Sequence, residues 1–247
     1  MRAPSRLLVW SIAAALALPA LACRSRADDR EDARTAARPS SAAVPPQASI
    51  AAASVPAAPA DARPRIVVLG DSLTAGLGLP IAAAYPSLLQ QRLKAGGLDL
   101  EVVNAGVSGD TSAGGLARLD WALQGDVRVL IVALGGNDAL RGLPADQLQQ
   151  NLSEIIERAQ SKGIAVILAG MEAPPNYGRE YTVSFRQAYR DLARRYNVTL
   201  LPFLLDKVAG NPALNQGDGI HPNPQGARIV ADTVWSVLKP MIDAAAP

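Results

Sequence analysis

Five short apolar runs recur along the chain after residue 64. None of them alternates between apolar and polar positions, which is typical of strands that are buried on both faces of a parallel sheet. Gly or Pro residues and polar clusters bound the runs. The five predicted strands are 66–69, 100–103, 127–134, 164–168 and 198–201.

Between these runs, apolar residues recur every three or four positions, which predicts amphipathic helices. Alternating strands and helices indicate an α/β fold in which helices cover both faces of a five-stranded parallel sheet. The predicted buried faces are Tyr85, Leu88, Leu89 and Leu93; Leu148, Leu152, Ile155, Ile156 and Ala159; Phe185, Tyr189 and Leu192; and Ile229, Val230, Val234, Val237 and Leu238.

The most distinctive loops follow the first three predicted strands. Right-handed crossovers place the carboxyl ends of parallel strands along one edge of the sheet, where ligands bind in such folds. The loops at 70–72, 104–111 and 135–138 are rich in glycine and polar side chains. We therefore expect the functional site at this edge.

The first 22 residues have the pattern of a signal peptide. Arg2 and Arg6 precede an uncharged apolar stretch at 7–21, and Ala20-Leu21-Ala22 has the small-x-small form of a cleavage site. The alternative is a transmembrane anchor, but the stretch is shorter than the roughly 20 residues that a span requires. We expect export and cleavage.

Cys23 directly follows the predicted cleavage site, as in bacterial lipoproteins, where that cysteine becomes acylated. Ordinary cleavage beside an incidental cysteine is the alternative. Residues 23–63 are rich in Ala and Pro with few large apolar side chains, which predicts a disordered tether. The predicted organisation is a signal peptide at 1–22, a tether at 23–63 and a folded domain at 64–247 that carries the function. We expect the protein in the periplasm or anchored to a membrane by a lipid on Cys23.

If Cys23 is acylated, the mature protein begins at this residue and carries the mass of the attached acyl groups. Mass spectrometry of the mature N-terminus measures this directly. An unmodified Cys23 would contradict the lipoprotein hypothesis.

Composition restricts the chemistry. The chain has a formal net charge of +2, one Cys and one His, so an intramolecular disulfide or a zinc site built from His and Cys is excluded. The counts leave a carboxylate-only Mg²⁺ or Ca²⁺ site open, although no D-x-D-x-D-G loop is present. Through Arg63 there are eight basic and five acidic residues, and sixteen and seventeen thereafter. Without a basic cluster, we expect no nucleic-acid partner.

Imidazole chemistry near neutral pH must use His221, the single histidine. Asp218 lies three residues before it in a turn and can orient the ring. Ser72, in the sharp turn after the first strand, can serve as a nucleophile that His221 activates, although a helix N-cap is its simpler interpretation. The N–H of Ser72, the N–H of Gly109 and the amide of Asn137 can stabilise an oxyanion.

Four sequence blocks resemble those of the SGNH, or GDSL, hydrolase family, in the family's order over roughly residues 65–243. They are Gly70-Asp71-Ser72-Leu73, the block containing Gly109, Gly135-Gly136-Asn137-Asp138, and Asp218-x-x-His221.

Two longer segments resemble the subfamily of arylesterases, lysophospholipases and acyl-CoA thioesterases: Gly70-Asp71-Ser72-Leu73-Thr74-Ala75-Gly76 and Pro174-Pro175-Asn176-Tyr177-Gly178. The resemblance implies a flavodoxin-like three-layer fold and hydrolysis of esters or thioesters through an acyl-serine intermediate, without a cofactor. We interpret Asp71 and Asp138 as residues that structure their loops.

Several alternatives compete with this interpretation. The same residues suit a carbohydrate O-acetyl esterase that acts on envelope polysaccharide. A phosphate-binding module is disfavoured because the sequence contains no G-x-x-x-x-G-K-[ST] motif and no G-x-G-x-x-G at the first turn. A non-catalytic envelope protein is disfavoured because all four family blocks are present. The absence of G-x-S-x-G argues against an α/β-hydrolase. Segment 174–182 is either a substrate-shaping loop or a plain connection, and a monomer is expected.

Overall fold

The computed structural model describes residues 63–245. The predicted signal peptide, nearly all of the tether and Cys23 lie outside this range. Within it, no helix combines the length and the apolar character needed to cross a membrane.

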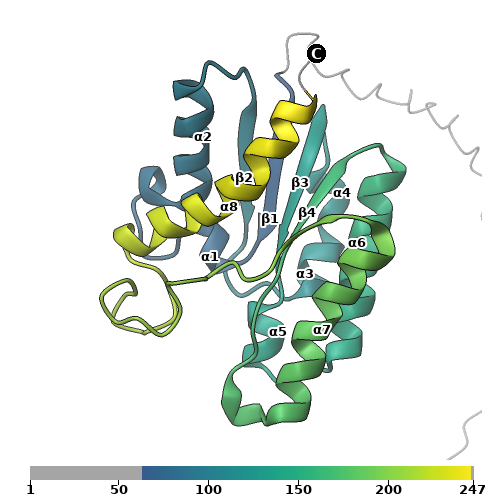
Figure 1. Cartoon of the computed structure of the whole chain (residues 1–247), viewed down its shortest axis with the longest axis vertical. Coiled ribbons are helices and arrows are strands. Elements are labelled where there is room, and N and C mark those ends of the chain that lie inside the picture. Colours follow the sequence, from purple (N-terminus) through teal and green to yellow (C-terminus); the bar gives the residue numbers. More distant parts are fainter. Residues whose placement is uncertain (1–62, 246–247) are drawn as a thin grey trace, which may run out of the picture. The chain divides into compact units, whose positions relative to one another are not determined.

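The centre of the domain is a sheet of five parallel strands in the order β2-β1-β3-β4-β5 (Figure 1). Each predicted apolar run forms one strand, because residues that are apolar at consecutive positions need cover on both faces of the sheet. In β3, for example, every residue after the second is buried. The strands are β1 (Arg65–Gly70), β2 (Glu101–Gly106), β3 (Val127–Ala133), β4 (Ala165–Ala169) and β5 (Thr199–Leu201).

Helices cover both faces of this sheet. The connection from β1 to β2 runs toward one edge of the sheet, and the connections from β2 to β5 run toward the other edge. Because the crossovers are right-handed, the helices of these two sets of connections lie on opposite faces of the sheet. Helix α2 (Tyr85–Ala95) packs against α8 (Pro224–Ala245). Helix α6 (Ala145–Ser161) packs between α3 (Ser112–Ala117) and α7 (Arg179–Tyr196). The three-layer α/β prediction is confirmed.

Shorter helical segments lie in the connections. They were not predicted, because a single turn is too short to show a 3.6-residue period. They are α1 (Ser72–Ala75), α4 (Leu119–Ala122), α5 (Gly136–Leu140) and the 3₁₀ turns η1 (Ile81–Ala83) and η2 (Pro175–Tyr177).

One strand boundary differs from the prediction by more than one residue. Strand β2 continues through Asn104 and Ala105 to Gly106, whereas the sequence assigned these three residues to a glycine-rich loop. The extension arises because β2 pairs with β1 along its whole length, so that Gly106 lies opposite Gly70. The loop therefore begins at Val107, three residues later than predicted.

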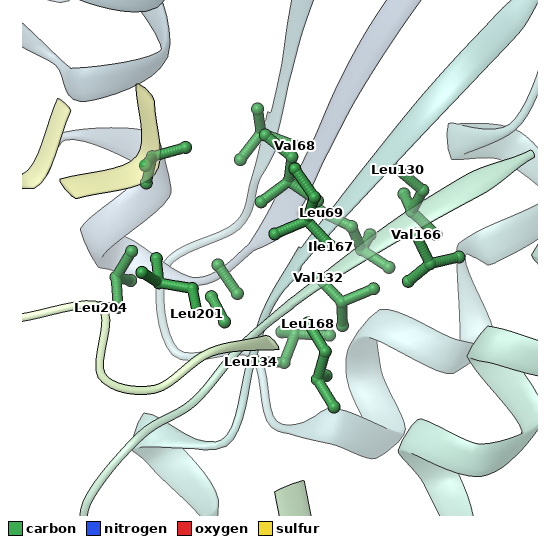
Figure 2. Close-up of a cluster of buried hydrophobic side chains, with 14 of the residues drawn as sticks. Val68, Leu69, Leu130, Val132, Leu134, Val166, Ile167, Leu168, Leu201 and Leu204 are labelled. Carbon is green, nitrogen blue, oxygen red and sulfur yellow. The ribbon is translucent and has the colours of Figure 1, made fainter. Parts of the chain in front are cut away.

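The core lies between the sheet and its helices, and Figure 2 shows side chains from β1, β3, β4 and β5 meeting there. The predicted apolar face of α6 is entirely buried. Helix α7 contributes Phe185 and Tyr189, whose rings pack edge to face at 5.8 Å. The buried hydroxyl of Tyr189 donates to the Leu134 carbonyl at 2.9 Å. This bond fixes α7 against the end of β3, directly before the turn that carries Asn137.

Candidate active site

The carboxyl ends of the three central strands lie level with one another. Gly70, the last residue of β1, pairs with Gly106 in β2 and with Ala133 in β3. The three loops singled out in the sequence therefore leave the sheet side by side. As predicted, they bring Ser72, Gly109 and Asn137 to one edge.

Ser72 is the first residue of α1, which begins immediately after β1. The turn is tight: a Cβ atom at Gly70 would lie 2.0 Å from Thr74 Oγ1, and one at Gly106 would lie 2.2 Å from the Ala75 nitrogen. Glycine at both positions lets α1 approach the sheet this closely. Asp71 caps the helix by accepting from the Leu73 N–H at 3.0 Å, so Ser72 is not the cap.

Ser72, His221 and Asp218 form a continuous hydrogen-bonded chain. Ser72 Oγ lies 2.9 Å from His221 Nε2, and His221 Nδ1 lies 2.7 Å from Asp218 Oδ2. The side chain of His221 is 17% exposed, whereas that of Asp218 is 45% exposed. This geometry allows the imidazole to take a proton from the serine hydroxyl while the carboxylate holds the ring.

The turn around Asp218 keeps its carboxylate charged. Oδ1 accepts from the backbone N–H groups of Ile220 and His221 at 2.9 and 3.0 Å, and Oδ2 faces the imidazole. These hydrogen bonds, the backbone ones first, lower the pKa of Asp218 from 3.8 to about 2. The Asp218 side chain is therefore a negatively charged acceptor for His221 throughout the neutral range.

Two backbone donors are available for an oxyanion. Neither the N–H of Ser72 nor that of Gly109 has an acceptor among residues 63–245. The first is free because it begins a helix. Gly109 has a φ of 85°, a left-handed conformation that favours glycine. Arg141, which the sequence did not single out, donates from Nη2 to the Gly109 carbonyl at 2.7 Å and holds this peptide in place.

The amide of Asn137 reaches the same place but is already engaged. Its Nδ2 lies 3.1 Å from Asp71 Oδ2 and 3.0 Å from the Asp110 carbonyl oxygen. Both N–H bonds of the amide thus have acceptors, a feature that the sequence does not reveal. For Asn137 to donate to an oxyanion, it must share or release one of these hydrogen bonds.

Two other aspartates near the site, Asp71 and Asp138, make structural contacts, as their interpretation as loop-structuring residues predicts. Asp138 is buried and accepts from Ser112, at 2.8 Å from the backbone nitrogen and 2.5 Å from Oγ. Asp71 is buried, caps α1 by accepting from the Leu73 N–H, and accepts from Asn137 Nδ2. Neither hydrogen-bonds to His221. Burial raises the pKa of Asp71 from 3.8 to about 6, against the opposing effect of its hydrogen bonds from Leu73 and Asn137.

An apolar groove of about 210 Å³ opens beside Ser72 and His221. Pro174 is one of the residues that line this groove, so segment 174–182 contributes to the groove and also connects β4 to α7. On the other side of Ser72 lies a niche of about 10 Å³, enough for roughly one water molecule. The apolar side chains that line the groove include Leu140, Met171, Phe203, Leu205 and Ile220.

Over the part of the chain that the structure describes, no three His, Cys, Asp or Glu side chains are grouped so as to hold a metal ion.

Comparisons with known proteins agree with this geometry. The model of the GDSL-like lipase/acylhydrolase family matches residues 68–229. Esterase TesA of Pseudomonas aeruginosa is 44% identical over 178 residues, which cover 72% of this chain and 89% of that protein. Thioesterase 1/protease 1/lysophospholipase L1 of Escherichia coli K12 is 40% identical over 179 residues, covering 72% and 85%.

Solved structures share the fold. The crystal structure of TesA matches with a TM-score of 0.69 and covers 72% of this chain and 99% of that one. A psychrotrophic esterase EstA from Pseudoalteromonas sp., inhibited by monoethylphosphonate, has the same TM-score at 33% identity, with 72% and 98% covered.

The raised pKa of Asp71 predicts a pH-dependent stability. The folded protein holds the Asp71 proton more tightly than the unfolded chain does. Protonated Asp71 therefore adds its full contribution to the free energy of unfolding below about pH 4, and this contribution is lost as the pH rises through about 6. Asn at this position cannot titrate. We expect the free energy of unfolding of Asp71→Asn, relative to the wild type, to rise between pH 4 and pH 6.5 and then level off.

Urea unfolding at half-unit pH intervals measures this difference. Asp126→Asn is a suitable control, since Asp126 sits at the opposite end of the sheet beside Arg128. A difference between Asp71→Asn and wild type that stays constant from pH 4 to pH 7 would contradict the assignment.

Proposed function

Because the chain belongs to the GDSL-like lipase/acylhydrolase family, we propose that it hydrolyses esters and thioesters with Ser72, His221 and Asp218 as its catalytic triad. It is an ester hydrolase of this family. The observation that carries the residue assignment is the unbroken series from Ser72 Oγ through His221 to Asp218, with separations of 2.9 and 2.7 Å.

In the proposed reaction, His221 Nε2 removes the proton of Ser72 as Oγ attacks the acyl carbon. The tetrahedral oxyanion accepts from the N–H groups of Ser72 and Gly109, and from Asn137 once its amide turns toward the substrate. His221 then protonates the leaving alcohol or thiol, which departs and leaves an acyl-Ser72. A water molecule, deprotonated by the same imidazole, attacks this intermediate and releases the carboxylic acid.

The groove beside the triad supports an acyl substrate with an apolar chain. Its walls carry Met171, Phe203 and Ile220, and Glu172, one of two acidic residues in the lining, is paired with Arg186 at 3.1 Å. A sugar ring needs several hydrogen-bonding partners, whereas an alkyl chain gains from apolar burial. The relatives named thioesterase and lysophospholipase are consistent with this choice over a carbohydrate O-acetyl esterase.

Replacing the proposed base tests the mechanism. His221→Ala removes the group that activates Ser72, so we expect kcat for p-nitrophenyl esters to fall by about 10⁴-fold or more. Since His221 lies at the surface edge of the site, circular dichroism and thermal unfolding should remain close to the wild type. Turnover within tenfold of the wild type would contradict the triad.

Substrate preference is tested with p-nitrophenyl esters of two to sixteen carbons and with acetylated sugars. Leu140 lines the groove and is 48% exposed, so Leu140→Ser should preserve the fold. Loss of roughly 1 kcal/mol of apolar contact predicts a kcat/KM about fivefold lower for long esters, with the acetate unaffected.

Val183→Ser is the matched control, because Val183 is an equally exposed apolar residue away from the groove. It should leave the whole profile unchanged. Preferential hydrolysis of acetylated sugars by the wild type would favour the carbohydrate esterase instead.

A further inference from the structure

Arg118, which no sequence motif marks, connects two of the three loops of the site. It lies between α3 and α4, and its side chain is 18% exposed. Nε donates to Asp110 Oδ2 at 2.6 Å, and Nη2 donates to the Gly70 carbonyl at 2.8 Å. One guanidinium therefore links the end of β1, two residues before Ser72, to the residue that follows Gly109.

The third loop closes this linkage into a ring. The Asp110 carbonyl accepts from Asn137 Nδ2 at 3.0 Å, and the same amide donates to Asp71 Oδ2 at 3.1 Å. Asp71 follows Gly70 in the chain. The ring thus runs from Gly70 through Arg118, Asp110 and Asn137 to Asp71. Of the three residues that provide oxyanion donors, Asn137 belongs to the ring, and Ser72 and Gly109 are each next to one of its members.

The local sequence is adapted to this arrangement. A Cβ atom at Gly114 would lie 2.9 Å from Asp110 Oδ1, so glycine makes room for the carboxylate against α3. Arg118 Nη1 is fully buried and has no hydrogen-bond partner among the residues that the structure describes. A buried donor without an acceptor destabilises a fold, and a partly buried ion pair seldom stabilises more than apolar residues of the same size would. Stability alone is therefore a poor explanation for Arg118.

We propose that Arg118 and Asp110 are positioning residues for ester hydrolysis, which hold the Gly109 N–H at the correct distance from the Ser72 N–H. This inference rests on the proposed function. Neither side chain touches the substrate; each acts through the loop that carries Gly109. An oxyanion hole works only when its donors are fixed before the charge develops, and a displacement of about 1 Å can reduce the rate by about 10²-fold.

The fork geometry explains why this position needs arginine. A planar guanidinium reaches a carboxylate and a carbonyl at once with fixed angles, whereas a lysine ammonium is a single point of charge on a flexible stem. We therefore expect Arg118→Lys to recover only part of what Arg118→Met loses.

Arg65 provides a matched control. Its Nε donates to Glu101 Oε2 at 2.9 Å and its Nη1 to the Gln124 carbonyl at 3.3 Å, so it also joins a carboxylate to a carbonyl. It does so at the amino end of β1, away from the site. Arg65→Met removes the same kind of linkage without touching the oxyanion loop.

The test compares steady-state kinetics and inhibition by an alkyl boronic acid, which forms a tetrahedral adduct that resembles the transition state. For Arg118→Met we expect kcat to fall about 10- to 100-fold, boronate affinity to fall in parallel, and KM to change less than threefold. Arg65→Met should lower thermal stability but keep kcat and boronate affinity within twofold. Asp110→Asn should behave like Arg118→Met, and the double variant should lose little more than either single one.

An Arg118→Met enzyme with kcat and boronate affinity within twofold of the wild type would overturn the proposal, as would an equal loss in Arg65→Met. If Arg118→Met does not fold, Asp110→Asn decides by the same criteria. Failure of the proposed function is a separate result: the wild type would then cleave no ester, or Ser72→Ala would remain active.

Discussion

The turn between β1 and α1 is the constraint on which the site depends. Glycine at positions 70 and 106 lets the first turn of α1 lie against the sheet, where any side chain would meet the backbone of Ala75 or the side chain of Thr74. The Ser72 N–H is free because Ser72 begins α1, and the Ser72 hydroxyl lies 2.9 Å from His221 Nε2. The parallel register then carries the other two loops to the same edge, because Gly70 lies level with Gly106 and Ala133.

Asp218 and Asp71 show how their surroundings give two identical side chains different properties. Asp218 lies at the surface, accepts two backbone N–H bonds and has its pKa lowered to about 2, so it remains an anion beside His221. Asp71 is buried next to Ser72, and its pKa is raised to about 6. It holds Asn137 and caps α1 instead of orienting the imidazole. Burial and hydrogen bonding, more than position in the sequence, separate these roles.

Much of this architecture could be predicted from the sequence because the relevant signals are strong and local. The strands are continuous apolar runs, the helical faces of α6 and α7 follow a clear period, and a single histidine leaves one choice of imidazole. Asp218 and His221 lie three residues apart in one turn, so their contact needs no knowledge of the fold.

Other features depend on packing between segments that are distant in sequence. The contacts of Arg118 with Gly70 and of Asn137 with Asp71 span 48 and 66 residues, and nothing in the local pattern marks them. The length of β2 follows from its pairing with β1 and not from its own polar residues, such as Asn104. The apolar groove is likewise assembled from loops after several strands, so its lining is visible only in the folded chain.

The most direct test of the account is to identify which residue reacts with a fluorophosphonate probe, by labelling the purified protein and mapping the adduct by peptide mass spectrometry. Ser108→Ala serves as the control, since Ser108 is an exposed serine on the neighbouring oxyanion loop. The account predicts one adduct, on Ser72, in the wild type and in Ser108→Ala, and none in Ser72→Ala. An adduct on another serine, or undiminished labelling of Ser72→Ala, would contradict the assignment of Ser72 as the nucleophile.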